Sequence, residues 1–251
     1  MKLRLDKLLV ERGLTPSRER AQALILAGRV LVNEQKIEKA GANVTEDSDI
    51  RVLGDDLPYV GRGGLKLASA LKHWQIQVNG KTCLDVGAST GGFTDCLLQA
   101  GAARVIAVDT GYGQMDARLR SDPRVRLLEK TNARYLTHKQ LWAGEQPEPI
   151  ALVVMDVSFI SATQVLPAVA RCVQGEGHCW ELVLLVKPQF EVGREQVGKG
   201  GIVRDVGAQQ AAVEKVSRAV VELGGQAVEV IESSILGAEG NREFLLHAIF
   251  H

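Results

Sequence analysis

The sequence predicts an α/β protein in which a doubly wound domain, built on a seven-stranded and mostly parallel sheet, follows a small α+β domain. Two observations lead to this fold class. Beyond residue 65, short runs of apolar residues alternate with stretches of helical periodicity, as in a series of strand–helix–strand units. The apolar runs are nearly continuous, for example from Ala151 to Val157, which is typical of strands that are buried on both faces of a parallel sheet.

Residues 1–58 are predicted to form the smaller domain. A helical spacing of leucines that starts at Leu5 ends at Gly13, and Ser17 offers an N-cap to a second helix that runs to Gly28. Short strands are then expected at Arg29–Asn33, Ala42–Val44 and Ile50–Leu53. Residues 1–40 hold nine basic and five acidic residues. Two solvated helix faces are the simpler explanation of this local charge, and a nucleic-acid surface is the other.

Residues 59–64 are predicted to form an interdomain linker, in which Gly61, Gly63 and Gly64 leave the backbone flexible. Residues 65–251 form the larger domain, which begins with a helix at Leu65–Trp74. Its predicted strands are Thr82–Val86, Arg104–Val108, Val125–Glu129, Ala151–Val157, Leu182–Lys187, Ala227–Ile231 and Arg242–Phe250. Its further predicted helices are Gly92–Ala100, Ala162–Val173 and Ala208–Leu223.

The composition excludes several function classes. Thirty lysines and arginines balance thirty aspartates and glutamates, so a globally basic nucleic-acid protein is excluded, although a local basic surface is not. The four cysteines have no zinc-ligand spacing, and no metal site is expected. No apolar stretch approaches the ~20 residues that span a membrane, and the N-terminus lacks the apolar core of a signal peptide. We therefore expect a cytoplasmic protein without membrane contact.

A glycine-rich turn, Asp85 to Asp95, connects the first strand of the larger domain to the next helix. Glycines let a ligand approach the backbone, and a helix N-terminus attracts an anionic group. Gly87 and Gly92 match the dinucleotide pattern GxGxxG, but Ser89 replaces the middle glycine, which admits a pyrophosphate. This favours a nucleotide-like cofactor with a carboxylate, such as S-adenosylmethionine. The predicted cofactor-binding residues in the turn are Asp85, Gly87, Ala88, Ser89, Thr90, Gly91, Gly92 and Phe93.

Two polar residues at the ends of the next strands extend this site. Asp109 ends the second strand, 22 residues after Gly87, where an acid accepts hydrogen bonds from both hydroxyls of a ribose. Asn132 follows the third strand and is placed to reach the edge of an adenine. A tight turn that binds no ligand is the alternative. The glycine-rich turn, the acid at Asp109 and the order of the strands together favour a cofactor site.

Asp156 and Lys187 end the fourth and fifth predicted strands. Open α/β sheets bind ligands at the carboxyl ends of their strands. A lysine at the end of an apolar strand loses hydration, which favours its neutral form and suits it to act as a general base toward a weakly acidic hydroxyl. A solvated lysine and an ordinary strand-end aspartate are the simpler alternatives.

Ten short segments, spread over nearly the whole chain, match the motifs of a known family. They are Arg4-Leu5-Asp6, Ser17-Arg18, Ala27–Val30, Arg62–Leu67, Asp85–Thr94, Gly111–Gln114, Lys130–Arg134, Asp156–Ser161, Lys187–Gly193 and Gly240–Glu243. With these segments the chain resembles the TlyA group of 2′-O-ribose rRNA methyltransferases, which often carry the label haemolysin. The larger domain is similar to the Rossmann-like FtsJ/RrmJ methyltransferases, and the N-terminal domain resembles the small RNA-binding module named after ribosomal protein S-four.

The resemblance implies S-adenosylmethionine as the cofactor and a Lys-Asp-Lys-Glu tetrad as the catalytic group. Lys66, Asp156, Lys187 and Glu243 match the tetrad, with Glu239 as the competitor of Glu243. The implied reaction is an in-line displacement in which a ribose 2′-hydroxyl attacks the sulfonium methyl group. Lys187 would act as the base or steer the oxygen, the two carboxylates would orient the lysines and the sugar, and no metal would be required. Most of the catalysis would then be positioning.

The resemblance also implies ribosomal RNA, or a ribosomal subunit, as the partner of an enzyme that we expect to be a monomer. It assigns phosphate contacts, which position an enzyme without reading bases, to the N-terminal domain. The residues concerned are Arg4, Arg18 and Lys39, supported by Arg20, Arg29 and Lys36. Arg62 would transmit RNA docking to the active site. Because the chain ends at His251, directly after the last strand, it resembles the subgroup that modifies a cytidine of large-subunit rRNA; small-subunit rRNA is the alternative.

Three other functions stay open at this stage. A secreted cytolysin would agree with the family label, but the sequence offers no signal peptide and no long amphipathic stretch rich in lysine. A catalytically silent RNA-binding protein would bind RNA through the N-terminal domain but transfer no methyl group. A dehydrogenase is the most distant alternative, because it would require the glycine that Ser89 replaces.

Overall fold

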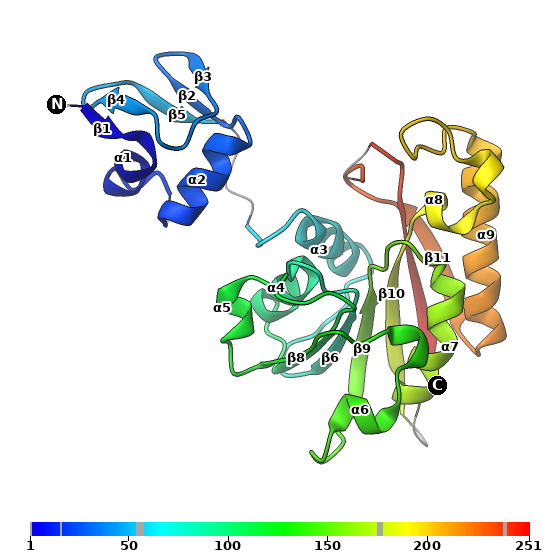
Figure 1. The fold of residues 1–251 in the computed structure, drawn as a ribbon. Coiled ribbons are helices and arrows are strands. Elements are labelled where there is room, and N and C mark those ends of the chain that lie inside the picture. The colour runs from blue at the N-terminus through cyan, green and yellow to red at the C-terminus, as the bar shows by residue number, and fades with distance from the viewer. Residues whose placement is uncertain (1, 16, 54–57, 175–177, 238–239) are drawn as a thin grey trace. The chain divides into compact units, whose positions relative to one another are not determined.

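The computed structural model describes residues 2–15, 17–53, 58–174, 178–237 and 240–251, and the chain divides into two compact units, Met1–Pro58 and Tyr59–His251 (Figure 1). The first unit contains helices α1 (Leu5–Glu11) and α2 (Arg18–Leu26) and strands β1 (Lys2–Arg4), β2 (Val30–Val32), β3 (Gln35–Ile37), β4 (Asn43–Thr45) and β5 (Ile50–Val52). Strands β3-β2-β5 form one sheet, and β1 pairs with β4. Buried leucines and isoleucines of both helices pack against β2, β4 and β5 to form the core of this unit.

Ser17 caps α2 as predicted, because its Oγ accepts a hydrogen bond from the backbone nitrogen of Arg20 at 3.2 Å. The prediction missed β1 and β3. Each of them holds one apolar residue beside charged or polar ones, Lys2-Leu3-Arg4 and Gln35-Lys36-Ile37, and β3 is largely exposed, so neither shows the apolar run that marks a strand in a sequence.

The second unit is built on a seven-stranded sheet with the strand order β11-β12-β10-β9-β6-β7-β8 (Figure 1). Its strands are β6 (Thr82–Val86), β7 (Arg104–Val108), β8 (Val125–Leu128), β9 (Ile150–Met155), β10 (Trp180–Val186), β11 (Gln226–Glu232) and β12 (Phe244–Phe250). Strands β6 to β10 are parallel to one another, and β12 runs antiparallel between β10 and β11. The predicted fold class is therefore confirmed, and the carboxyl ends of five parallel strands lie along one edge of the sheet.

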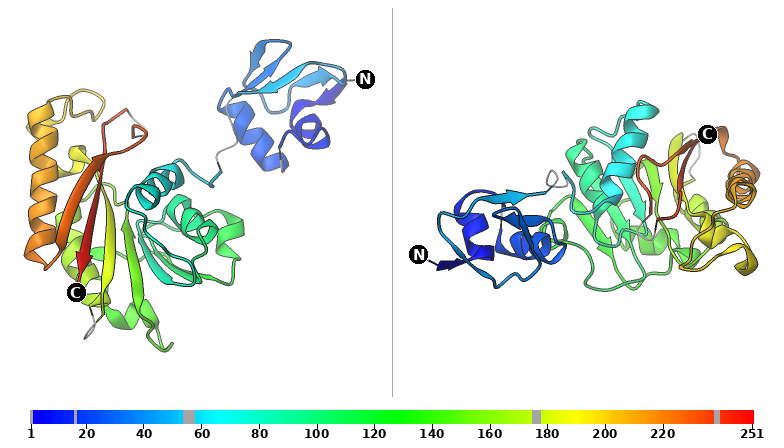
Figure 2. Two further views of the ribbon diagram at one scale, coloured as in Figure 1. Left: turned by 180° about the vertical axis from the view of Figure 1, so that it is seen from behind. Right: turned by 90° about the horizontal axis from the view of Figure 1, so that it is seen from above.

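Helices cover both faces of this sheet (Figure 2). Helices α3 (Gly63–His73) and α4 (Gly92–Gln99) bury Leu67, Leu71 and Leu97 on one face, whereas α7 (Ala162–Val173) and α9 (Val206–Glu222) pack on the other. Shorter helical segments that the sequence did not predict are α5 (Ala117–Arg120), η1 (Ala133–Tyr135), α6 (His138–Trp142), α8 (Pro188–Glu191) and η2 (Arg194–Gln196).

The glycine-rich segment before α3 is packed, which corrects the prediction of a flexible linker up to residue 64. Gly63 and Gly64 are the first residues of α3. A Cβ at Gly64 would lie 2.3 Å from Cγ of Tyr59, and a Cβ at Gly92 would lie 3.1 Å from the nitrogen of Gly64. Glycine at these positions therefore serves close packing between the starts of α3 and α4.

We expect Trp180→Ala to lower the free energy of unfolding by roughly 3–5 kcal/mol. Trp180 begins β10, is 2% exposed, and stacks on Phe250 with ring centroids 4.0 Å apart. Urea unfolding followed by circular dichroism measures the change, with Val221→Ala on the exposed surface of α9 as the control. A loss for Trp180→Ala as small as that of the control would contradict this account of the core.

Candidate active site

The turn after β6 lies directly against the end of β9. Gly87 has a φ of +87°, and a Cβ at this residue would lie 2.4 Å from the carbonyl oxygen of Asp156. Ser89 also adopts a positive φ, of 48°, although it replaces the glycine of the dinucleotide pattern. Gly91 is the N-cap of α4 with a φ of +97°. Only a residue without a side chain fits at Gly87, so glycine there is required by the contact with β9.

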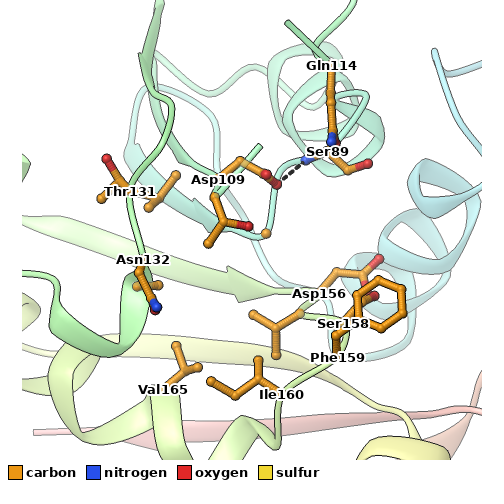
Figure 3. A pocket seen from close by; sticks show the side chains of 15 residues that line it. Ser89, Asp109, Gln114, Thr131, Asn132, Asp156, Ser158, Phe159, Ile160 and Val165 are labelled. Atoms are coloured by element: carbon orange, nitrogen blue, oxygen red, sulfur yellow. Dashed lines mark hydrogen bonds between the residues drawn. The ribbon is translucent and has the colours of Figure 1, made fainter. Parts of the chain in front are cut away.

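Asp109, at the end of β7, is held by the loops on both sides of it. Its Oδ2 accepts a hydrogen bond from the backbone nitrogen of Ser89 at 2.8 Å (Figure 3). Its Oδ1 accepts one from the backbone nitrogen of Gly111 at 2.6 Å. A carboxylate has about four lone-pair positions, so these two bonds fix the group and leave acceptor capacity for a ligand.

A cavity of about 250 Å³, which we call the turn cavity, opens beside this carboxylate. It is lined by Gly87, Ser89, Val108, Asp109, Thr110, Gln114, Thr131, Asn132, Ala133, Asp156, Val157, Ser158, Phe159, Ile160 and Val165. Figure 3 shows Thr131 and Asn132 on one side of it and Asp156, Ser158 and Phe159 on the other. The Oδ1 atom of Asn132 accepts a hydrogen bond from the nitrogen of Arg134 at 3.0 Å, which leaves its amide nitrogen as the donor for a ligand.

Four of the predicted cofactor residues, Gly87, Ser89, Asp109 and Asn132, thus line one cavity. The structure places the side chains of Ala88 and Phe93 in the hydrophobic core instead, and Asp85 is fully buried with its Oδ2 accepting from Thr94 Oγ1 at 2.6 Å. Thr90, Gly91 and Gly92 are not among the lining residues. The turn was predicted as a continuous run, but of its eight residues Gly87 and Ser89 alone line the cavity, so a cofactor contact by the other six stays a prediction.

A second cavity, of about 490 Å³, lies at the ends of β9, β10 and β12, and we call it the lysine cavity. It brings together all four predicted tetrad residues from positions far apart in the sequence. Its lining residues are Lys66, Asp156, Ser158, Phe159, Lys187, Gln189, Phe190, Val197, Gly201 and Glu243. Glu239, the competitor of Glu243, lies outside the described residues.

The two lysines of this cavity are each paired with a carboxylate. Lys66 Nζ donates to Glu243 Oε2 in a buried ion pair. Lys187 Nζ lies 2.6 Å from Asp156 Oδ1 and donates to Ser158 Oγ at 2.8 Å. Glu243 directly precedes β12 rather than opening it as predicted. A ligand in the lysine cavity would therefore meet two ammonium groups and two carboxylates whose positions are fixed by ion pairs.

Asp156, Ser158 and Phe159 line both cavities, so the two spaces adjoin. Phe159 is 93% exposed, has a φ of +64°, and lies 5.3 Å from the ring of Phe190, centroid to centroid. Soluble proteins expose single large apolar side chains without consequence, but this one stands at the junction of two cavities. Neither Ser158 nor Phe159 was among the predicted site residues, although both lie within three residues of Asp156, the predicted strand-end aspartate.

Glu191 fixes the segment after β9 to the segment after β10. Its buried carboxylate accepts from Ser161 Oγ and from the backbone nitrogen of Ala162, both at 2.6 Å, and pairs with Lys215 of α9 at 3.1 Å. Ser161 is the N-cap of α7, so this carboxylate also complements the positive end of that helix. The carboxylate of Glu191 therefore fixes the segments that contain Phe159 and Lys187 to the start of α7 and to α9.

Comparison with known proteins decides the family. The model of the FtsJ-like methyltransferases matches residues 59–250, and that of the S4 domain matches residues 3–50. The chain belongs to the FtsJ-like methyltransferase family.

Individual relatives agree with this assignment. The chain is 45% identical to the 16S/23S rRNA (cytidine-2′-O)-methyltransferase TlyA of Mycobacterium tuberculosis, over 97% of this chain and 88% of that protein. A solved structure of a hemolysin-named protein from Streptococcus thermophilus is 40% identical, with a TM-score of 0.74 over 99% of this chain and 88% of the other. An S-adenosylmethionine-dependent methyltransferase from Aquifex aeolicus, 15% identical with a TM-score of 0.50 over 76% of this chain and 95% of the other, shares the fold.

In the S4 domain of this FtsJ-like protein, two predicted RNA-binding arginines converge on one acid. Asp6 is fully buried and accepts from Arg4 Nε at 3.0 Å, Arg18 Nε at 2.9 Å and Gln22 Nε2 at 2.8 Å. Each guanidinium keeps 44% of its side chain exposed. The carboxylate thus holds two half-exposed cations side by side, an arrangement that suits phosphate oxygens.

The other predicted RNA contacts are more scattered. Lys36 pairs with Glu38 at 2.9 Å, Lys39 is exposed, and Arg29 is half-buried. Arg62, in the second unit, donates to the carbonyl oxygen of Leu236 at 2.9 Å, which ties the start of α3 to the loop before Glu243. An RNA contact by these residues and by Arg20 stays a prediction.

We expect Asp85→Asn to change how stability depends on pH. Burial raises the pKa of Asp85 to about 7, above the ~3.9 of an exposed aspartate, so between these values the folded protein keeps a proton that the unfolded chain releases. The contribution of this proton to stability is complete below roughly pH 4 and is lost as the pH rises to about 7. Urea unfolding of both proteins between pH 5 and 8 should show this decline in the wild type relative to the Asn variant. A constant difference across the range would refute the buried protonation.

Proposed function

We propose that the protein transfers a methyl group from S-adenosylmethionine to the 2′-hydroxyl of a cytidine ribose in ribosomal RNA. The observation that carries the proposal is the shared wall of the two cavities. Because Asp156, Ser158 and Phe159 line both, a methyl donor in the turn cavity lies next to the paired lysines. Membership of the FtsJ-like methyltransferase family supports this reaction class.

The turn cavity fits the proposed cofactor. The pre-oriented carboxylate of Asp109 suits a pair of ribose hydroxyls, and the amide nitrogen of Asn132 suits an acceptor on an adenine edge. Gly87 keeps the floor of the cavity free of a side chain. S-adenosylmethionine supplies an electrophilic methyl group on a sulfonium. The group that leaves is a neutral thioether, and its departure needs no metal.

The lysine cavity would hold and activate the ribose. We assign to Lys187 the task of steering the 2′-oxygen, with Asp156 and Ser158 fixing the position of Nζ at 2.6 and 2.8 Å. Once its ammonium group has released a proton to solvent, the neutral amine takes the proton of the 2′-hydroxyl as the oxygen attacks the methyl carbon, and the thioether of the cofactor leaves. The buried pair of Lys66 and Glu243 would orient the sugar and keep the cavity polar. Holding the oxygen in line with the methyl carbon accounts for most of the expected rate gain.

The nature of the RNA is proposed from the relatives and from the S4 domain. The M. tuberculosis relative is named for cytidine-2′-O methylation of 16S and 23S rRNA. We favour large-subunit rRNA as the target, with small-subunit rRNA as the alternative. The intact tetrad opposes a catalytically silent RNA-binding protein, since both ion pairs are formed.

We further propose that the enzyme works as a cytoplasmic monomer without membrane contact. No helix among the described residues has the length and apolar character to cross a bilayer. Size-exclusion chromatography with light scattering tests the monomer.

The function itself is tested by deleting the gene and mapping the 2′-O-methyl groups of rRNA by mass spectrometry. We expect one cytidine of the large-subunit rRNA to lose its methyl group and to regain it when the purified protein and labelled cofactor are added to isolated subunits. Failure to label subunits of either size from the deletion strain would refute the proposal.

Lys187→Ala should abolish transfer and leave cofactor binding intact. Removing a positioned base or steering group costs about 10²- to 10⁴-fold in rate, whereas Lys187 does not line the turn cavity. Asp109→Ala is the matched variant, expected to raise the dissociation constant of the cofactor about tenfold or more by removing charged acceptors. Methyl transfer and calorimetry separate the two effects. If Lys187→Ala lost RNA binding instead, Lys187 would be a phosphate contact.

Phe159→Ala should raise the KM for RNA about tenfold, because an exposed ring at the junction of the cavities offers a stacking surface to the target base. Since the ring is 93% exposed, the melting temperature should stay unchanged. Phe159→Trp, which keeps an aromatic face, is the control and should stay near wild type. An unchanged KM in the Ala variant would show that the ring has no part in substrate binding.

A further inference from the structure

The exposed aromatic rings of the described residues are concentrated at one place. The chain has eleven Phe, Trp and Tyr residues, and those that are exposed are Tyr112, Tyr135 and Phe159, at 70%, 67% and 93%. They follow β7, β8 and β9, three strands whose carboxyl ends share one edge of the sheet. Tyr112 and Tyr135 each lie within two residues of the lining of the turn cavity, and neither has a part in the proposed reaction.

Each of the two tyrosines carries a cation on its ring. Lys130 Nζ lies 4.4 Å from the ring centroid of Tyr112, and Arg134 Cζ lies 5.6 Å from that of Tyr135. A cation over one face of a ring leaves the other face open, which agrees with the large exposed fractions of both tyrosines. We call the four residues the tyrosine rim.

The cations of the tyrosine rim differ from the neighbouring ones in their partners. The arginines that precede them in the sequence each pair with a carboxylate: Arg118 with Asp116, Arg120 with Glu129, Arg124 with Asp122 and Arg126 with Glu145. Within the part of the chain that the structure describes, neither Lys130 nor Arg134 forms an ion pair with a carboxylate. Lys130 attracts Glu129 only at longer range, and that carboxylate is already paired with Arg120. Both cations are therefore available for an external anion.

The loops that carry the rim are tied together. Lys130 N donates to the carbonyl oxygen of Gly111 at 3.0 Å, and the backbone nitrogen of Gly113 donates to Glu129 Oε1 at 2.6 Å. Glu129 is in turn held by Arg120 at 2.6 Å. Tyr112 and Lys130 therefore stand on a preformed surface, which lowers the entropy cost of binding a ligand there.

We propose that the tyrosine rim binds a single-stranded stretch of the substrate RNA that flanks the modified nucleotide. The two open ring faces stack on bases, and Lys130 and Arg134 contact phosphates. Single-stranded RNA is recognised by this combination of aromatic platforms and cations. A protein partner would require a larger apolar patch than two isolated rings. This inference rests on the proposed function, since it takes rRNA as the substrate.

The test compares two double variants that differ only in aromatic character. Tyr112→Leu with Tyr135→Leu removes the stacking faces but keeps apolar side chains, whereas Tyr112→Phe with Tyr135→Phe keeps the rings. Dissociation constants are measured for ribosomal subunits of both sizes, purified from the deletion strain, and separately for S-adenosylmethionine by calorimetry. Both positions are exposed, so melting temperatures near that of the wild type verify folding.

We expect the Leu double variant to bind the target subunit about tenfold more weakly or worse, because the stacking faces are lost. Its cofactor affinity should be unchanged. The Phe double variant should bind both ligands like the wild type. Lys130→Ala and Arg134→Ala should each reduce the slope of log affinity against log salt concentration by about 0.7–0.9.

Two results would overturn the inference. Unchanged subunit binding by the Leu double variant would mean that the rings do not touch RNA, and weakened cofactor binding with unchanged subunit binding would mean that they cover the cofactor instead. Both results are readable from binding alone. They are therefore distinct from failure of the proposed function, in which the wild-type protein binds subunits but methylates neither.

Discussion

The contact between Gly87 and the backbone of Asp156 is the constraint on which both cavities depend. Asp156 N donates to the carbonyl oxygen of Val86 at 2.9 Å, so the ends of β6 and β9 lie side by side, and a side chain at Gly87 would force them apart. Because they stay together, Asp156 lines both the turn cavity and the lysine cavity. In the proposed reaction, the methyl donor and the acceptor hydroxyl meet at this shared wall.

The charges of the lysine cavity are organised as two pairs, and burial makes that pairing necessary. Lys66 and Glu243 are 177 residues apart in sequence and keep only 9% and 4% of their side chains exposed. A buried ion pair costs desolvation free energy and contributes little net stability, but loss of one partner is expensive. The pair therefore acts as a positioning device that joins α3 to the start of β12, reinforced by the contact of Arg62 with Leu236.

In our proposal, chemistry and RNA recognition use neighbouring parts of the carboxyl edge. The proposed tetrad lies on α3 and at the ends of β9, β10 and β12, the proposed cofactor residues follow β6 to β8, and the tyrosine rim lies in the loops after β7 and β8. In the S4 domain the cations are held by a buried acid, Asp6, whereas at the rim they lie on aromatic rings. The first arrangement suits phosphate alone, and the second suits phosphate together with a base.

Much of this protein was determined by its sequence alone. Apolar runs and glycine turns predicted the sheet, its parallel order and the strand ends at Asp109, Asp156 and Lys187, because hydrophobic periodicity and backbone freedom are local properties. The short strands β1 and β3 were missed because each holds one apolar residue beside charged or polar ones. The helical start of α3 was missed because glycines predict a flexible backbone, and the packing of Gly64 against Tyr59 is a tertiary contact.

Only the tertiary structure decided which side chains meet. It separated the glycine turn into residues that face the cavity and residues such as Phe93 that face the core. It paired Lys66 with Glu243, joined two cavities at Phe159, and placed Lys130 and Arg134 on rings rather than on carboxylates. Contacts of this kind depend on chain segments that are distant in sequence, and they form only when the whole sheet has brought the strand ends to one edge.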